Sequence, residues 1–199
     1  DQGWIQLWVE SAQEALDSSD IVSIAAYEDS FPFIEELTGR LKERKPDMPI
    51  ILGGSLVTSI PEVVMKNTGA DIAVLGEGEI TILELLNSLN DKKNVPGICF
   101  KDANNNIIFT KPRPQMKNLD DLPVWDLSLW PSVKEDTHIK EILYSHSRGC
   151  YRDCSFCFRT TPQLAYKSVH KVKEELAELK KRHNFEFIYF VDLTWVIER

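Results

Sequence analysis

The chain has 199 residues and a formal net charge of −8 at pH 7, from 23 Lys and Arg against 31 Asp and Glu. This acidic balance disfavours a nucleic-acid backbone as the main partner, and no apolar run reaches the roughly 20 residues of a membrane span. Residues 1–10 carry Asp1 and Glu10 and no basic cluster, so we expect no secretory signal and a cytoplasmic protein. The sequence starts at Asp1 and ends directly after a predicted strand, so we expect it to be an internal part of a longer protein.

Helical and strand patterns alternate along residues 10–90. Strands are expected at 21–26, 49–52 and 72–75, and helices at 10–17, 32–45, 59–67 and 82–89. Ser59, Pro61 and Glu62 have the spacing of a capping box with a proline in the first helical turn. Strands that are apolar throughout and separated by helices predict a parallel α/β sheet covered on both faces.

Glycines follow two of these strands, as Gly53-Gly54 and as Gly76 and Gly78. Ligands of parallel α/β sheets bind at the carboxyl ends of the strands, where glycine lets backbone approach a bulky ligand. We therefore expect both glycine pairs at one edge of the sheet. From the glycines alone, tight turns without a ligand are the simpler interpretation.

The pattern changes after residue 95. Residues 97–101 and 106–110 read as a hairpin, and residues 111–131 as a proline-rich linker. Cys99 alternates with apolar neighbours in the first hairpin strand, which predicts an inert buried thiol.

A second βαβ pattern begins near residue 141. A strand is expected at 142–146, a helix at 168–183 and a strand at 187–191, which is the first unit of a parallel barrel or sheet. Asp192 ends the second strand at the rim where barrel sites lie. It is interpreted either as a ligand contact or as a solvated turn residue.

Three of the four cysteines, Cys150, Cys154 and Cys157, follow the first strand of this unit with C-x3-C-x2-C spacing. Thiolates are soft ligands that suit iron–sulfur clusters, zinc or copper. Three thiolates on one loop can bind three corners of a [4Fe–4S] cubane and leave the fourth iron open. A zinc site with His146 as fourth ligand is the alternative, whereas three clustered cysteines cannot all form disulfides.

This spacing, with Phe156 just before the last cysteine, resembles the signature of the radical S-adenosylmethionine (SAM) enzymes. The resemblance implies that the three cysteines bind a [4Fe–4S] cluster whose open iron chelates SAM. One electron from the cluster then cleaves SAM to methionine and a 5′-deoxyadenosyl radical. The resemblance also implies that Phe156 lies near the adenine, and Asp192 is the further candidate for a SAM contact.

The order of the elements resembles one subclass, the radical SAM enzymes with an N-terminal cobalamin-binding domain. The matching motifs are Gly53-Gly54, Thr58, Pro61-Glu62, Gly76 to Glu79, Pro96 to Ile98 and Leu119 to Pro123. The resemblance implies a Rossmann-like cobalamin-binding domain over 1–94, incomplete at its N-terminus, a hairpin and interdomain linker over 95–140, and the start of a partial TIM barrel over 141–199. The residues it places near cobalamin are Gly53, Gly54, Thr58, Gly76, Glu77 and Gly78.

Two departures leave a second interpretation open. Ala25 stands where many members carry a serine, and Ser55-Leu56-Val57 replaces a Pro-His pair. The N-terminal domain is thus either a cobalamin binder or a scaffold without cobalamin, and a non-enzymatic zinc-binding module is the third alternative. All histidines follow the glycine-bearing domain, so we expect none from this sequence on cobalt.

The resemblance implies methyl transfer or cyclisation on a small-molecule or peptide substrate. It also implies an electron donor such as flavodoxin or ferredoxin.

Overall fold

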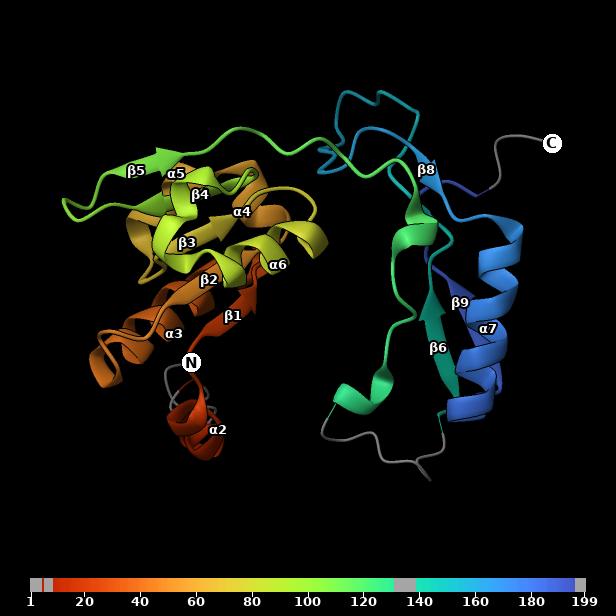
Figure 1. Cartoon of the computed structure of the whole chain (residues 1–199), viewed down its shortest axis with the longest axis horizontal. Coiled ribbons are helices and arrows are strands. Elements are labelled where there is room, and N and C mark those ends of the chain that lie inside the picture. The colour runs from red at the N-terminus through yellow and green to blue at the C-terminus, as the bar shows by residue number, and fades with distance from the viewer. Residues whose placement is uncertain (1–4, 6–8, 131–138, 196–199) are drawn as a thin grey trace. The chain divides into compact units, whose positions relative to one another are not determined.

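The structure is a computed structural model that describes residue 5 and residues 9–130 and 139–195 (Figure 1). It divides into two compact units, Asp1–Pro114 and Gln115–Arg199. The expected hairpin therefore lies in the first unit, together with the alternating helices and strands, and the expected linker over 111–131 crosses the boundary between the two units. Linker residues 131–138 lie outside the described part of the chain.

Unit 1, residues 1–114, is built on a five-stranded sheet with the order β1-β2-β3-β4-β5. Its strands are β1 (Val22–Ala25), β2 (Ile50–Gly53), β3 (Ile72–Val74), β4 (Ile98–Lys101) and β5 (Ile107–Phe109). The first three strands run parallel, as expected. The hairpin strands β4 and β5 extend the same sheet in antiparallel fashion, with Ala73 opposite Cys99 and Cys99 opposite Phe109. The sheet is therefore mixed.

Helices cover both faces of this sheet. They are α2 (Gln13–Ser18), α3 (Phe31–Arg44), α4 (Ser55–Ser59), α5 (Pro61–Asn67) and α6 (Glu79–Asn87), with 3-10 turns η1 (Glu28–Ser30) and η2 (Leu89–Asn94). None of the helices in the described residues is long and apolar enough to cross a membrane.

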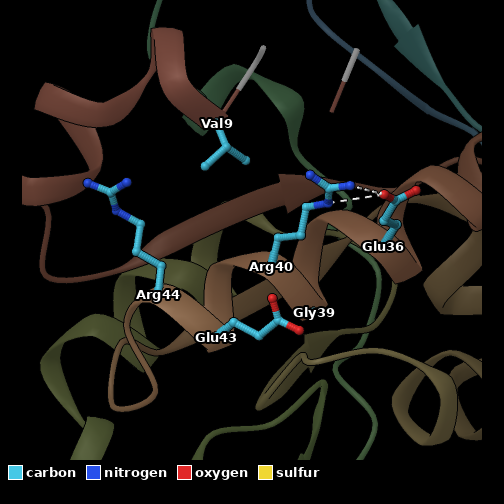
Figure 2. Close-up of a pocket in the computed structure, with 6 residues that line it drawn as sticks. All are labelled: Val9, Glu36, Gly39, Arg40, Glu43 and Arg44. Carbon is cyan, nitrogen blue, oxygen red and sulfur yellow. Dashed lines mark hydrogen bonds and ion pairs between the residues drawn. The ribbon is translucent and has the colours of Figure 1, made fainter. Parts of the chain in front are cut away.

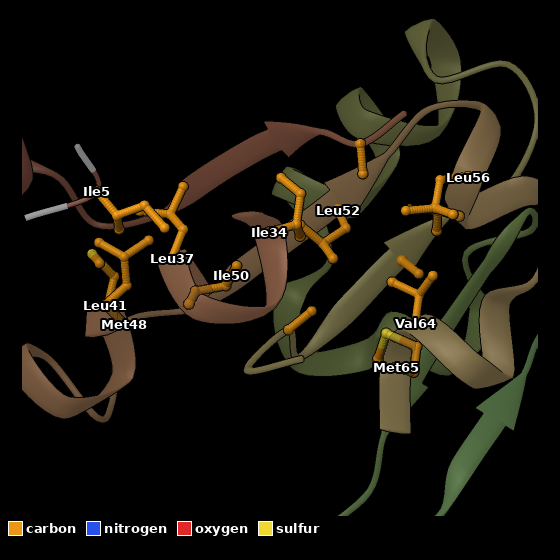
Figure 3. Packing of buried hydrophobic residues seen from close by; sticks show 14 of the residues in the cluster. Ile5, Ile34, Leu37, Leu41, Met48, Ile50, Leu52, Leu56, Val64 and Met65 are labelled. Carbon is orange, nitrogen blue, oxygen red and sulfur yellow. The ribbon is translucent and has the colours of Figure 1, made fainter. Parts of the chain in front are cut away.

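The two faces of the sheet belong to separate hydrophobic clusters because side chains alternate along a strand. Ile50 and Leu52 pack with Leu37 of α3 and Met65 of α5, as Figure 3 shows. Ile51, between them, packs on the opposite face with Leu85 of α6. Cys99 is fully buried in the first cluster, and burial raises the pKa of its thiol to about 11, so the expected inert thiol is confirmed.

The expected capping box at Ser59 is wrong. Residues 55–67 form two helices, and Ser59 ends α4, where its hydroxyl donates to the carbonyl of Ser55 at 2.7 Å. Ile60 precedes α5 without a side-chain cap. Helix α4 begins directly after Gly54, and it places Leu56 and Val57 in the core, where both are buried.

Unit 2, residues 115–199, contains the expected βαβ arrangement. Strands β6 (Glu141–Tyr144) and β9 (Phe187–Phe190) are parallel, and α7 (Val169–His183) lies between them in sequence. Ser168 caps α7 by accepting from the Lys171 amide at 3.1 Å. The core of the unit joins Ile142 and Tyr144 to Leu179 and Phe185.

Short elements complete unit 2. They are the 3-10 turns η3 (Leu119–Asp121) and η4 (Leu127–Leu129) and the strands β7 (Ser147–Arg148) and β8 (Ala165–Tyr166). The two strands pair in antiparallel fashion, and the sequence patterns did not predict them.

Candidate functional site

The strand-end glycines of unit 1 lie at one edge of the sheet, as predicted. Gly53 ends β2, and Gly76 follows the parallel neighbour β3. The Thr58 hydroxyl joins the two loops, because it accepts from the Gly76 amide at 3.0 Å and donates to the Gly54 carbonyl at 3.0 Å. The structure therefore brings Gly53, Gly54, Thr58 and Gly76 together.

Gly54 and Gly76 both have a positive φ, but their surroundings differ. Gly54 has a φ of 104°, and a Cβ there would lie 2.5 Å from the carbonyl oxygen of Ala26, so no side chain fits. Gly76 has a φ of 74°, but a Cβ there would meet nothing within 4 Å. The space in front of Gly76 is therefore open. A face of this kind fits a broad flat ligand such as a corrin, which needs backbone without side chains.

Glu77 and Gly78 directly precede helix α6, and Gly78 is the N-cap residue of that helix. The Glu77 carbonyl accepts from the Thr81 hydroxyl at 3.1 Å, and the Gly78 carbonyl accepts from the Ile82 amide at 2.7 Å. A Cβ on Gly78 would lie 3.8 Å from Val74, which is ordinary contact. Their backbone role is therefore clear, and a contact with cobalamin stays a prediction.

The residues that depart from the family pattern also have clear positions. Ala25 is the last residue of β1, opposite Gly53, and it is exposed. Leu56 and Val57 belong to the core, while the Ser55 hydroxyl donates to a Glu28 carboxylate oxygen at 2.9 Å. The segment that replaces Pro-His thus belongs to α4.

A pocket beside α3 lies apart from these glycines (Figure 2). It is lined by Val9, Glu36, Gly39, Arg40, Glu43 and Arg44. Arg40 is paired with Glu36 at 2.6 Å, so the charges of this lining are partly neutralised within the helix. None of the predicted site residues lines it.

The cysteine loop of unit 2 is closed at its base by the pairing of β7 with β8. Gly149 has a φ of 87°, and a Cβ there would overlap the carbonyl oxygen of Gln163, so the close approach of the two arms requires glycine. Inside the loop Arg159 donates to the Cys150 carbonyl at 3.1 Å and to Asp153 at 2.6 Å. The loop therefore has a defined base and an internal cation.

The thiol of Cys150 lies in surroundings that favour the thiolate. Thr194 donates a hydrogen bond to the sulfur at 3.1 Å, and the Arg152 amide donates at 3.4 Å. These hydrogen bonds, with the charges of Arg159 and Arg152, outweigh burial and lower the pKa of Cys150. A lowered pKa is what a thiolate metal ligand needs.

The three thiols are not gathered round one point. Cys150 and Cys154 are partly buried and Cys157 is exposed. Across the described parts of the chain, no group of three or more His, Cys, Asp or Glu side chains is placed to hold a metal ion. The chemistry of the donor set fits an iron–sulfur cluster, whereas the ligand set itself stays a prediction.

The side chains of Phe156 and Asp192 differ in their exposure to solvent. The Phe156 side chain on the cysteine loop is 91% exposed and thus accessible to a ligand. The Asp192 side chain is fully buried, which makes the solvated-turn interpretation wrong. One of its oxygens, Oδ1, accepts from the amides of His146 and Ser147 at 3.0 and 2.6 Å and from the hydroxyls of Ser145 and Ser147.

A buried polar cluster of unit 2 was missed from the sequence. Glu175 is fully buried and accepts from the Tyr144 hydroxyl at 2.7 Å and from Lys167 at 2.5 Å. Burial and the Glu175 carboxylate raise the pKa of Tyr144 far above its ordinary 10.0. The available signal was the position of Glu175 on the apolar face of α7, beside Val172 and Leu179, where a charge needs a partner.

The chain is similar to one protein-family model and to several known proteins. A family model described as "B12 binding domain" matches residues 8–86. An uncharacterized methyltransferase of Pyrococcus horikoshii is 29% identical over 189 residues, which are 90% of this chain and 41% of that protein. The anaerobic magnesium-protoporphyrin IX monomethyl ester cyclase of Synechocystis sp. is 29% identical over 168 residues, which are 81% of this chain and 34% of the cyclase. The chain thus spans less than half the length of these relatives.

A solved structure shares the fold of nearly the whole chain. It is the cobalamin-dependent S-adenosylmethionine radical enzyme OxsB with aqua-cobalamin and S-adenosylmethionine bound. The TM-score is 0.75 at 20% identity, and the match covers 98% of this chain and 28% of that one. The predicted fold class, a Rossmann-like α/β domain followed by the start of a second α/β unit, is thereby confirmed.

Proposed function

Because the chain belongs to the radical SAM enzymes that carry an N-terminal cobalamin-binding domain, we propose that it is the cofactor-binding portion of a cobalamin-dependent methyltransferase. One observation carries the proposal. The B12-binding match over residues 8–86 covers the parallel strands β1, β2 and β3, and open space lies in front of Gly76 directly after β3.

In this proposal unit 1 binds cobalamin along the strand-end edge. The contacts are Gly53, Gly54, Thr58, Gly76, Glu77 and Gly78. Gly76 offers bare backbone to the corrin, while Thr58 holds the Gly54 and Gly76 loops at a constant separation. The histidines His146, His170 and His183 all lie in unit 2, and His138 lies outside the described residues, so no histidine of the described part of unit 1 binds cobalt.

Unit 2 holds the second cofactor pair in the same proposal. Cys150, Cys154 and Cys157 bind a [4Fe–4S] cluster, and Phe156 and Asp192 belong to the SAM site. When bound, the cluster supplies the single electron that cleaves SAM. The thiolate-favouring surroundings of Cys150 and the exposure of Phe156 support these roles, whereas both oxygens of Asp192 face residues 145–147. Asp192 would thus act on SAM through the position of the loop.

The remaining parts of the proposal concern the whole enzyme. The substrate is a small molecule or a peptide, the electron donor is a flavodoxin or ferredoxin, and the compartment is the cytoplasm. Cyclisation is the second candidate reaction, favoured by the identity of 29% to the Synechocystis cyclase over 81% of this chain.

Anaerobic reconstitution of the chain with iron and sulfide tests the proposal together with a cobalamin titration. We expect about four irons per chain, a bound cobalamin seen by its change in absorbance, and loss of iron in each of Cys150→Ala, Cys154→Ala and Cys157→Ala. Iron without cobalamin would favour the scaffold alternative. Stoichiometric zinc without iron would favour the zinc-binding module and overturn the proposal.

A further inference from the structure

We infer that Thr194 sets the reduction potential of the cluster at Cys150, Cys154 and Cys157 by donating a hydrogen bond to the Cys150 sulfur. The inference rests on the proposed function, because it needs that cluster. Thr194 follows β9, 44 residues after Cys150 in the sequence, and no local motif connects the two residues.

The contact itself has a defined direction. The Thr194 Oγ1 atom lies 3.1 Å from Cys150 Sγ. A cluster-ligating thiolate has no proton to donate, so the threonine hydroxyl must be the donor. The Arg152 amide is a second donor to the same sulfur at 3.4 Å. Within the described residues, the Cys150 sulfur thus accepts from a backbone amide and from the side chain of Thr194.

The position of Thr194 is fixed by its neighbours on both sides. Two residues earlier, the Asp192 carboxylate binds the amides of His146 and Ser147. One residue later, the Trp195 ring packs on the His146 ring at 4.8 Å and on the Phe190 ring at 4.6 Å. The end of β9 is thus attached to the start of the cysteine loop, and the hydroxyl is directed by this attachment.

Reduction of the cluster adds one electron and makes its sulfur ligands more negative. A hydrogen bond to a ligand sulfur stabilises the more negative state more strongly, and such hydrogen bonds are among the factors that set cluster potentials. Loss of the Thr194 hydroxyl therefore lowers the midpoint potential and makes reduction of the cluster harder. Thr194 is a positioning and tuning residue in this inference, because it acts through Cys150.

The test is a redox titration of the reconstituted chain with dithionite as one-electron reductant, followed by the electron paramagnetic resonance signal of the reduced cluster. Thr194→Val removes the hydroxyl at nearly constant volume, Thr194→Ser keeps it, and Thr160→Val is the matched control in the same loop. We expect equal iron and sulfide content in all proteins. The midpoint of Thr194→Val should shift to lower potential, while Thr194→Ser and Thr160→Val should match the wild type.

The other possible results separate the inference about Thr194 from the proposed function. Equal midpoints for Thr194→Val and wild type, with the cluster present, would overturn the inference and leave the proposed function intact. A wild-type chain without iron would overturn both. If Thr194→Val loads no cluster, Thr194→Ala is titrated in its place. Loss of the cluster in Val and Ala but not Ser would mean that the hydroxyl holds the cluster, and tuning would be rejected.

Discussion

His146 Nδ1 lies 2.9 Å from Asp192 Oδ2, although the two residues follow different strands, β6 and β9. Both atoms are buried and have no other hydrogen-bond partner. Two buried acceptors cannot approach so closely, so a proton lies between them, and His146 carries it on Nδ1. This hydrogen bond to a carboxylate therefore connects the residue after β9 with the start of the cysteine loop.

Protonation of Asp192 at low pH should weaken its hydrogen bonds to residues 146 and 147. Burial opposes ionisation of Asp192, but hydrogen bonds from Ser147 and His146 outweigh it and lower the carboxyl pKa below the ordinary 3.8. A pKa lowered by folding contributes stability that is present above the unfolded value and is lost as pH falls through the folded value. We expect the free energy of unfolding, measured by urea denaturation from neutral pH to about pH 3, to fall steeply below about pH 4.

The variant Asp192→Asn should remove this acid-dependent part and cost about 3 kcal/mol at neutral pH, since it removes a buried carboxylate that accepts hydrogen bonds from the amides of His146 and Ser147. Asp29→Asn, at an exposed carboxylate, is the control. An unchanged acid profile in Asp192→Asn would contradict the assignment.

The two glycines Gly54 and Gly76 should respond oppositely to alanine. Gly54→Ala places a methyl 2.5 Å from the Ala26 carbonyl oxygen, so we expect the urea midpoint of unit 1 to fall sharply. Gly76→Ala places a methyl in open space and should cost only about 1 kcal/mol for its positive φ. Its cobalamin affinity should fall at least tenfold, about 1.4 kcal/mol, because the methyl occupies the proposed corrin face. Full affinity in folded Gly76→Ala would exclude that face.

The Thr58 hydroxyl should contribute both to the stability of unit 1 and to cobalamin binding. Thr58→Val loses the hydrogen bonds to Gly76 and Gly54 at constant shape, so we expect a loss of about 1 kcal/mol in unfolding free energy. Cobalamin binding should weaken as well, because the two glycine loops are no longer joined. Thr58→Ser keeps the hydroxyl and is the matched control in both measurements. Equal losses in the two variants would show that the effect does not depend on the hydroxyl.

The buried ion pair of unit 2 should show strong coupling. Lys167→Met leaves the Glu175 carboxylate, which is fully buried, without the partner at 2.5 Å, and we expect a loss of about 3 kcal/mol in urea denaturation. Adding Glu175→Gln removes the unpaired charge and keeps an acceptor for Tyr144, so the double variant should recover most of the loss. Lys173→Met, on the exposed side of α7, should have little effect. Additive losses in the double variant would show that the pair is not coupled.

Much of the fold could be read from local patterns. Ile34, Leu37 and Leu41 recur at the spacing of a helical face, and they are buried in α3, within the helix expected at 32–45. The apolar runs became β1, β2 and β3, and their glycines lie at one edge because parallel neighbours must end on the same side. Such features depend on residues a few positions apart, which is the range over which periodicity and turn chemistry act.

The tertiary structure alone decided which distant groups meet. Strand β4 pairs with β3, Asp192 binds residues 145–147, and Thr194 donates to Cys150. Ser147 and Asp192 are 45 residues apart in the sequence, and no spacing rule connects them. A hydrogen bond depends on a donor and an acceptor within about 3 Å, and only the alignment of β6 with β9 brings these atoms that close. The sequence by itself therefore determined the elements and the cofactor-type residues, and the pairing of strands decided which side chains support them.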